Sequence, residues 1–86
     1  MMIYIKNKII NYKYIKMISY DYTYDHYILI FLYSDNESDR FRVSSEEDSD
    51  SIMRFIISEY NNNCKVCDIN NWLDINNIEL ELECED

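Results

Sequence analysis

The chain contains neither glycine nor proline. The absence of glycine excludes the glycine-rich loops that hold phosphate groups in nucleotide-binding proteins. It also means that turns have to use asparagine, aspartate and serine, which tolerate a left-handed backbone or form local side-chain hydrogen bonds. Residues of these types stand between apolar segments at Asn7, Asp35-Asn36, Asn61–Asn63, Asn70-Asn71 and Asn76-Asn77.

Long apolar runs and an even set of cysteines are also missing. The longest apolar run, Tyr27–Tyr33, is far shorter than the ~20 residues of a membrane span. The segment Met1–Ile10 is interrupted by Lys6 and Lys8 and has no apolar signal core. Three cysteines are an odd number, which argues against a secreted disulfide framework. We therefore expect a cytoplasmic protein that makes no contact with membranes.

Positive charge is scarce and confined. Lysine and arginine number 8 against 17 acidic residues, which gives a formal net charge of -9 over 86 residues. Residues 1–20 contain four lysines and no acid, whereas residues 21–86 contain all the acids and only four cations. This balance predicts no direct binding to nucleic acid and an attraction to basic protein surfaces. Hydrophobic residues make up 48% of the chain, too many for a disordered acidic tail, so we expect one folded domain over residues 1–86.

Short apolar and alternating segments in the first half predict strands. His26–Tyr33 is continuously apolar after its first residue, which predicts a central strand buried on both faces. For residues 8–18 a helix is the alternative, because short apolar runs do not separate the two. The predicted strands are Met1–Ile5, a short strand at Ile9-Ile10, Tyr12–Tyr20, His26–Tyr33 and Arg40–Val43, with a turn at Asp21–Asp25 and a polar hairpin tip at Ser34–Asp39.

The clearest element is a helix over Ser44–Asn62. Ser44 with Glu47, or Ser45 with Asp48, forms a capping-box pattern, and the carboxylates of the first turns suit the positive end of a helix. The triplet Asn61–Asn63 ends it. One apolar face is predicted from helical spacing: Ile52, Met53, Ile56, Ile57 and Tyr60.

The last third predicts three short elements. Lys65–Ile69 is typical of a strand, and Asn71–Ile75 of a helical turn in which Trp72 and Ile75 cover the core. Residues 78–84 alternate between apolar residues and glutamate, which is strand periodicity. The expected fold class is therefore α+β: a small antiparallel sheet of three or more strands packed against one main helix.

Metal-binding and catalytic patterns are weak. Cys64 and Cys67 have zinc-ligand or redox spacing, but a structural zinc site needs four ligands, and the only other candidates are Cys84 and His26. We interpret the two cysteines as ordinary small residues, with no metal and no cofactor. The sequence around His26 supplies no activated nucleophile. With 17 acidic residues, many carboxylate pairs are possible, so no particular pair indicates a general acid and base. We therefore expect no enzyme activity.

Carboxylates gather at three places in the expected fold: the hairpin tip, the helix start and the last strand. A rigid acidic surface of this kind can present carboxylates where a partner normally binds phosphates. The residues expected to bind a partner are Asp35, Asn36, Glu37 and Asp39 at the tip, with Glu46, Glu47 and Asp50 as a second patch.

The stretch from Tyr27 to Glu83 resembles a known family. Its text ILIFLYSDNESDRFRVSSEEDSDSIMRFIISEY, followed by a tail ending IELELECED, is similar to the small acidic phage-encoded anti-CRISPR proteins that inhibit the type II effector nuclease. The resemblance implies a three-stranded antiparallel sheet, an acidic hairpin tip, one long helix, and mimicry of the DNA motif that the nuclease reads. Asp35, Asn36, Glu37 and Asp39 fall where the family's mimicking loop falls.

The chain departs from this family at three points. Its tip lacks glycine, its N-terminus predicts strands where the family has a helix, and NNNCKVCDINN replaces an acidic run. The partner implied is a CRISPR effector nuclease, or another basic nucleic-acid-binding protein, in the host cytoplasm. The alternative function is that of a small structural or accessory phage protein that acts by protein–protein interaction or self-associates through a free strand edge. The oligomeric state stays open.

Overall fold

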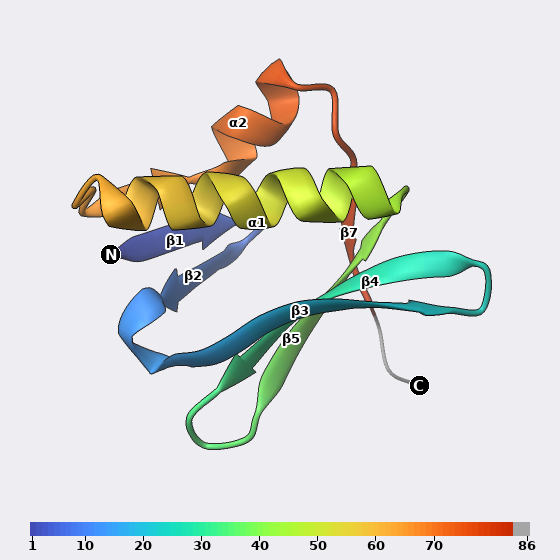
Figure 1. Ribbon diagram of the computed structural model, residues 1–86, viewed down its shortest axis with the longest axis horizontal. Coiled ribbons are helices and arrows are strands. Elements are labelled where there is room, and N and C mark those ends of the chain that lie inside the picture. Colours follow the sequence, from blue (N-terminus) through green and yellow to red (C-terminus); the bar gives the residue numbers. More distant parts are fainter. Residues whose placement is uncertain (84–86) are drawn as a thin grey trace.

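A computed structural model describes residues 1–83, which form two sheets and two α-helices (Figure 1). The larger sheet is antiparallel, with the strand order β3-β4-β5-β7. Its strands are β3 (Ile15–Thr23), β4 (His26–Tyr33), β5 (Ser38–Val43) and β7 (Leu80–Leu82). The main helix packs against this sheet, so the predicted α+β class with an antiparallel sheet is confirmed.

A second, three-stranded sheet has the order β2-β1-β6. Its strands are β1 (Met2–Ile5), β2 (Lys8–Asn11) and β6 (Val66–Asp68), and a single 3-10 turn, η1 (Tyr12–Tyr14), leads from β2 into β3. β1 and β2 form an antiparallel hairpin, whereas β1 and β6 are parallel. The strand interpretation of residues 8–18 is thus confirmed over a helix, with η1 as a short interruption.

The helix α1 (Glu46–Asn61) begins where the sequence places it. The Ser45 side chain accepts a hydrogen bond from the Asp48 backbone N–H at 3.1 Å, so the second of the two predicted caps is the one that forms. The helix ends at the asparagine triplet, with Asn62 as its C-cap. In Figure 1, α1 crosses the middle of the molecule, with α2 (Ile69–Ile75) on one side and the four-stranded sheet on the other.

Buried side chains from both sheets and both helices form one hydrophobic cluster. Phe31 of β4 and Phe41 of β5 meet edge to face, with ring centroids 5.7 Å apart. Ile52 and Ile56 of α1 are fully buried against them, and Trp72 of α2 stacks on Phe55 at 4.8 Å. Helix α1 is therefore held between the four-stranded sheet and α2.

Five sequence-based details are wrong. Ile75 is exposed at 71% and does not cover the core, and Ile57 and Tyr60 are half exposed, so the buried stripe of α1 is narrower than predicted. β3 runs to Thr23, so the turn is limited to two residues. The far face of β4 is only partly covered, because Ile28 is buried while Ile30 and Leu32 are not fully so. The last strand comprises Leu80–Leu82 among the described residues, and Cys84 lies outside them.

Because the chain has no glycine, other residue types adopt the positive-φ backbone conformation at its turns. Asparagines take this conformation at Asn36, Asn63 and Asn77, as their ability to tolerate it predicts. The sequence does not point to the same conformation at Lys6, Tyr24 and Asp25, with φ of 55°, 50° and 66°. Lys6 precedes Asn7 in the β1–β2 turn, and Tyr24 and Asp25 form the β3–β4 turn, which contains no asparagine.

Candidate functional site

The first turn of α1 holds one of the two predicted patches. Glu46 and Glu47 are exposed there, and the Tyr20 hydroxyl of β3 donates a hydrogen bond to Glu46 Oε1 at 2.7 Å. That hydrogen bond to a carboxylate raises the pKa of Tyr20. Asp50, one turn further along, accepts a hydrogen bond from Arg54 Nε at 2.8 Å. An open groove of about 600 Å³ lies here, lined by Tyr20, Tyr27, Ser44, Ser45, Glu46, Glu47 and Asp50.

More carboxylates stand at the same end of the four-stranded sheet. Tyr27 pairs with Val43, and Val43 pairs with Leu80, so the β3–β4 turn, the start of α1 and the start of β7 come together. A neighbouring hollow of about 300 Å³ is lined by Asp25, His26, Arg42, Val43, Ser44, Glu79 and Glu81. We name this region the acidic end and define it by the exposed carboxylates Asp25, Glu46, Glu47, Glu79 and Glu81.

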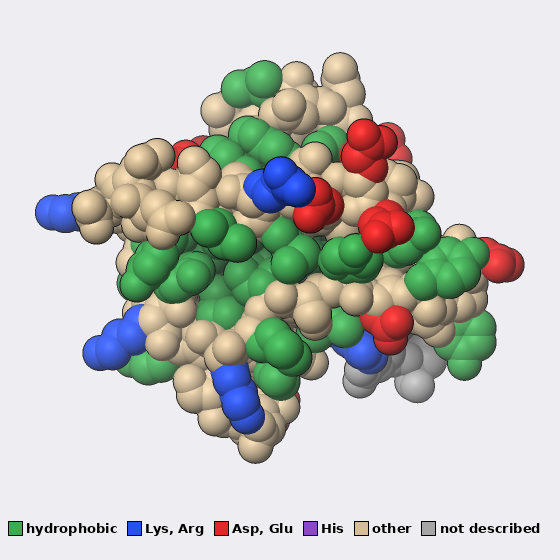
Figure 2. Space-filling view, in the orientation of Figure 1, with side chains coloured by type: hydrophobic (Ala, Val, Ile, Leu, Met, Phe, Trp, Pro, Cys, Tyr) green, Lys and Arg blue, Asp and Glu red, His purple; other side chains and the backbone are tan. Residues whose placement is uncertain are grey.

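The face shown in Figure 2 carries acidic side chains mainly towards the right and basic ones mainly towards the left and bottom. Of the four lysines of residues 1–20, Lys8 lies on β2, Lys13 on η1 and Lys16 on β3. Lys6, in the β1–β2 turn, instead lines a hollow with Glu79 and Glu81 of the acidic end. The separation of charge along the sequence is therefore only partly a separation in space, because Lys6 borders two carboxylates of the acidic end.

The predicted hairpin tip is a separate patch. Asp35, Asn36 and Glu37 are exposed in the β4–β5 loop, where Asp35 Oδ1 accepts a hydrogen bond from the Glu37 N–H at 2.9 Å. The six residues of β5 separate this loop from the start of α1, a span of roughly 20 Å at ~3.3 Å per residue. The structure thus does not bring the two predicted patches together.

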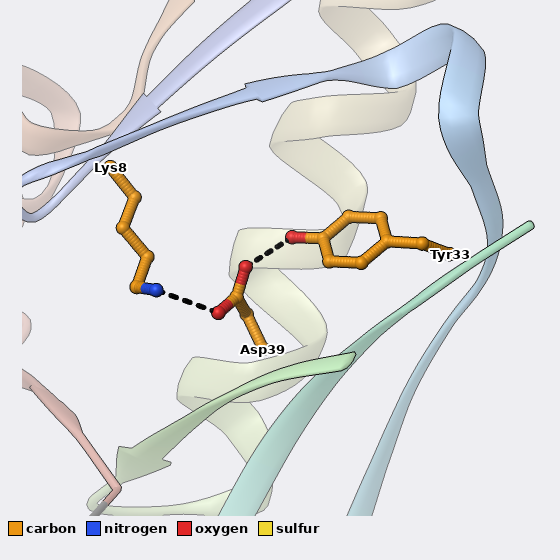
Figure 3. Close-up of polar contacts among 3 residues, drawn as sticks. All are labelled: Lys8, Tyr33 and Asp39. Atoms are coloured by element: carbon orange, nitrogen blue, oxygen red, sulfur yellow. Dashed lines mark hydrogen bonds and ion pairs between the residues drawn. The ribbon is translucent and has the colours of Figure 1, made fainter. Parts of the chain in front are cut away.

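Asp39 does not belong to the tip. It lies on β5, where its carboxylate accepts hydrogen bonds from Lys8 Nζ at 2.8 Å and from the Tyr33 hydroxyl at 2.5 Å (Figure 3). Lys8 comes from β2, so this ion pair ties the two sheets together. The sequence-based assignment of Asp39 to a free binding tip is therefore corrected: both of its oxygens are already engaged within the fold.

The contacts among Lys8, Tyr33 and Asp39 shift the pKa values of Asp39 and Tyr33. Burial by itself raises the pKa of Asp39, but the hydrogen bonds from Lys8 and Tyr33 lower it by more, and the net shift is downward. Burial, together with the hydrogen bond to Asp39, raises the pKa of Tyr33. The cluster borders a cavity of about 480 Å³ that is lined by Lys8, Ile9, Ile10, Asn11, Tyr14, Tyr33, Ser34, Asp35 and Asp39.

The cysteines lie in unlike surroundings. Cys64 Sγ donates a hydrogen bond to Glu59 Oε2 at 2.8 Å, which raises the pKa of the Cys64 thiol. Cys67 is fully buried in β6, and burial raises its pKa to about 12, so its thiol is unreactive at neutral pH. Among residues 1–83, no three histidine, cysteine or acidic side chains gather as metal ligands would, and Cys84 lies outside these residues.

Sequence reasoning missed the tyrosines beside the acidic end. Tyr22 and Tyr27 face each other across β3 and β4 with ring centroids 4.8 Å apart, and Tyr20 lies edge-on to Tyr27 at 6.5 Å. The signal was the spacing of Tyr20 and Tyr22 on one face of a strand, but the expected turn at Asp21–Asp25 concealed it.

None of the protein-family models, curated proteins and solved structures compared with this chain matches it. Neither helix of the described residues has the length and apolarity needed to cross a membrane.

Proposed function

We propose that the protein is an inhibitor of a CRISPR effector nuclease, as the sequence resemblance implies, and that it occupies the basic DNA-reading surface of that enzyme. The observation that supports this most is the acidic end, where five exposed carboxylates stand on strand ends, a tight turn and a helix start. These elements are held by the core, so little ordering entropy is lost when a partner binds them.

The chemistry of the acidic end suits an arginine-rich partner. Carboxylates accept charge-assisted hydrogen bonds from the same guanidinium groups that bind phosphates and guanine edges in DNA. Tyr20 and Tyr27 line the same groove as Glu46 and Glu47, and a guanidinium can stack on a tyrosine ring while it bonds a carboxylate. A flat cation therefore finds both an aromatic face and a charge in one place.

The second patch supports the same function by its position. Asp35 and Glu37 stand roughly 20 Å from the helix start, which corresponds to about six base-pair steps of 3.4 Å. Two separated acidic patches on one rigid hairpin can replace phosphates at two points along a DNA groove. Asp39 contributes by holding the hairpin to β2, and it needs no contact with the partner.

The test is inhibition of DNA cleavage by purified type II effector nucleases, with binding measured at several salt concentrations. Glu46→Gln combined with Glu47→Gln should weaken binding about tenfold at low salt, because exposed charges mainly accelerate association. Added salt should weaken binding of the parent protein and narrow this difference. Asp35→Asn combined with Glu37→Gln tests the tip in the same way.

Asp74→Asn is the control for a single change, Glu47→Gln. Both residues are exposed and helical, and each change removes one negative charge, but Asp74 lies on α2 and does not line the groove that Glu46 and Glu47 line. If both double variants inhibit as well as the parent, the acidic surface does not bind the enzyme. If capture with the tagged protein retrieves a different basic nucleic-acid-binding protein, the mimicry stands and the nuclease assignment is wrong.

A further inference from the structure

The edge of β3 is open. β3 is nine residues long and lies at the end of the four-stranded sheet, with β4 as its only neighbour among the described strands. Native proteins usually shorten, charge or cover such an edge, because its unpaired backbone groups bind other strands. Here a bulge and Lys16 interrupt the ladder between Ile15 and Met17, but the pairing is regular from Ile18 to Thr23.

The hairpin turn determines which backbone groups point outward. Tyr24 and Asp25 both have positive φ, which makes a two-residue turn of type I′, and Thr23 pairs with His26 across it. The pair that flanks such a turn is hydrogen-bonded, and hydrogen-bonded pairs alternate along an antiparallel ladder. The N–H and C=O groups directed to the open edge are therefore those of Ile18, Tyr20 and Tyr22.

A hydrogen bond of the structure agrees with this assignment. The Tyr22 N–H donates to Oδ1 of the preceding Asp21 at 2.8 Å, instead of to a carbonyl of β4. An outward amide that is bonded only to a neighbouring exposed side chain remains accessible to an incoming strand.

Apolar side chains accompany the open edge. Tyr22 is 56% exposed and Met17 51%. On α1, Ile57 is 48% exposed and lies between Met53 and Tyr60 at helical spacing, and we call these three residues the apolar flank of α1. Tyr60 stacks on Tyr12 of η1, with ring centroids 4.2 Å apart, so the apolar flank is directed towards β3. Figure 2 shows hydrophobic side chains lining a hollow between α1 and the segment below it.

Charge along the edge selects the occupant. Lys13 and Lys16 stand at the start of this segment, and Asp21 and Asp25 stand at its end, all of them exposed. When two copies of β3 pair antiparallel about its centre, the basic start of each lies beside the acidic end of the other. Opposite charges then meet twice, whereas parallel pairing would bring like charges together.

We propose that β3 pairs antiparallel with β3 of a second copy of this chain, so that two four-stranded sheets join into one across a twofold axis. The apolar flanks of the two α1 helices lie on the same side of this joined sheet. The inference is independent of nuclease inhibition, because its evidence is the backbone of β3 and the charges beside it.

The first test is the mass of the full-length protein by light scattering over a wide range of concentration, together with amide exchange by NMR. The mass should rise from that of one chain to that of two. As it rises, exchange at the amides of Ile18, Tyr20 and Tyr22 should slow, while the amides of Ser19, Asp21 and Thr23 should be protected at every concentration. These alternate residues are internal controls, because their amides already bond to β4.

The second test compares two substitutions at one residue. Tyr22→Pro removes an outward N–H that no β4 carbonyl accepts, and proline is tolerated on an edge strand. It should weaken the dimer about thirtyfold, because one interchain hydrogen bond is lost for each copy. Tyr22→Val keeps the N–H and the strand preference, so it should retain most of the association.

Lys16→Glu is a variant outside the regular ladder that leaves every backbone donor in place. It should weaken the dimer at low salt and have little effect at high salt, because it replaces an attraction by a repulsion. A mass that stays that of one chain at all concentrations would overturn the proposal. So would a dimer that Tyr22→Pro does not weaken, or one in which the alternation of amide protection is absent.

Discussion

Two carboxylates of this chain, Asp39 and Asp50, each form an ion pair with an N–O distance of 2.8 Å. The side chains of Asp39 and Lys8 are 22% and 35% exposed, whereas those of Asp50 and Arg54 are 51% and 79% exposed. Solvent screens the Asp50–Arg54 pair, and the long arginine side chain loses entropy when it is held in one geometry. Exposed pairs of this kind contribute about 0–1 kcal/mol. Asp39 also accepts a hydrogen bond from Tyr33, so removing its charge weakens two interactions of a partly buried cluster.

Asp39→Asn is therefore expected to lower the free energy of unfolding by about 1–2 kcal/mol at neutral pH. Asp50→Asn, which breaks the exposed pair of equal length, should change it by less than about 0.5 kcal/mol. Urea unfolding followed by circular dichroism measures both. Equal effects of the two substitutions would show that the Lys8–Asp39 pair does not tie the sheets.

Asp39 also makes the free energy of unfolding depend on pH. The pKa of Asp39 is lower in the folded protein than in the unfolded chain, so its carboxylate stabilises the fold above the ordinary aspartate pKa of about 3.9. That contribution is lost as the pH falls through the lowered, folded-state value. The acid limb of unfolding should accordingly be shallower in the Asp39→Asn variant than in the parent protein.

At the scale of elements, α1 carries adjacent isoleucines with opposite surroundings. Ile56 is fully buried in the core, while Ile57 is 48% exposed. Both stand in the same helix, one residue apart, so they have nearly the same local backbone and the same intrinsic helix propensity.

Ile56→Asp should destabilise the protein by about 3–5 kcal/mol, because it buries a carboxylate that has no partner. That is a large part of the roughly 5–15 kcal/mol by which a domain is stable, so the variant should be largely unfolded near 37 °C. Ile57→Asp should melt within a few degrees of the parent in dilute solution. Similar melting temperatures for both variants would contradict the assigned face of α1.

How well the sequence predicted each element depended on whether local residues determine it. The bounds of β4 follow from its apolar run, and α1 from the Ser45 cap and the asparagine triplet. β6 was foreseen as a strand, but its parallel partner β1 was not, because three residues carry no signal of a pairing across more than 60 positions. β3 was cut short because Tyr24 and Asp25 take a turn conformation that usually needs glycine or asparagine.

The sequence predicted which acidic residues are exposed near the helix start, but not how the residues of the site are arranged in space. Helix capping located Glu46 and Glu47 correctly at an exposed first turn. Asp39 was misjudged because its partner Lys8 lies 31 residues away and belongs to the other sheet. The tyrosines of β3 and the carboxylates of residues 79–81 join the site only through the pairing of strands, which no local pattern gives.

At the scale of the whole molecule, charge is unevenly placed. The net charge is -9, and the acidic end holds much of the excess, so the folded state suffers electrostatic repulsion at one end. Dissolved salt reduces this repulsion once the Debye length, ~30 Å at 0.01 M, falls to ~8 Å at physiological ionic strength.

The melting temperature should therefore rise with salt, by roughly 4–8 °C if about 1 kcal/mol of repulsion is screened. Glu46→Gln with Glu47→Gln should reduce this dependence, because it removes two charges from the crowded end. Differential scanning calorimetry at fixed pH measures the effect. A melting temperature that falls with salt would mean that attraction between the lysine-rich segment and the acids outweighs repulsion among the acids.

The parallel pairing of β1 with β6 has a consequence for how the chain is made. During synthesis β1 emerges first, and its partner β6 begins about 60 residues later, roughly 3–12 s at ~5–20 residues per second. Until then the β1–β2 hairpin has no third strand, and an isolated two-stranded hairpin is marginally stable in water. Ile3, Ile5 and Ile10, all buried in the finished protein, stay accessible to chaperones during that interval. The three-stranded sheet can therefore be completed only after β6 has been synthesised.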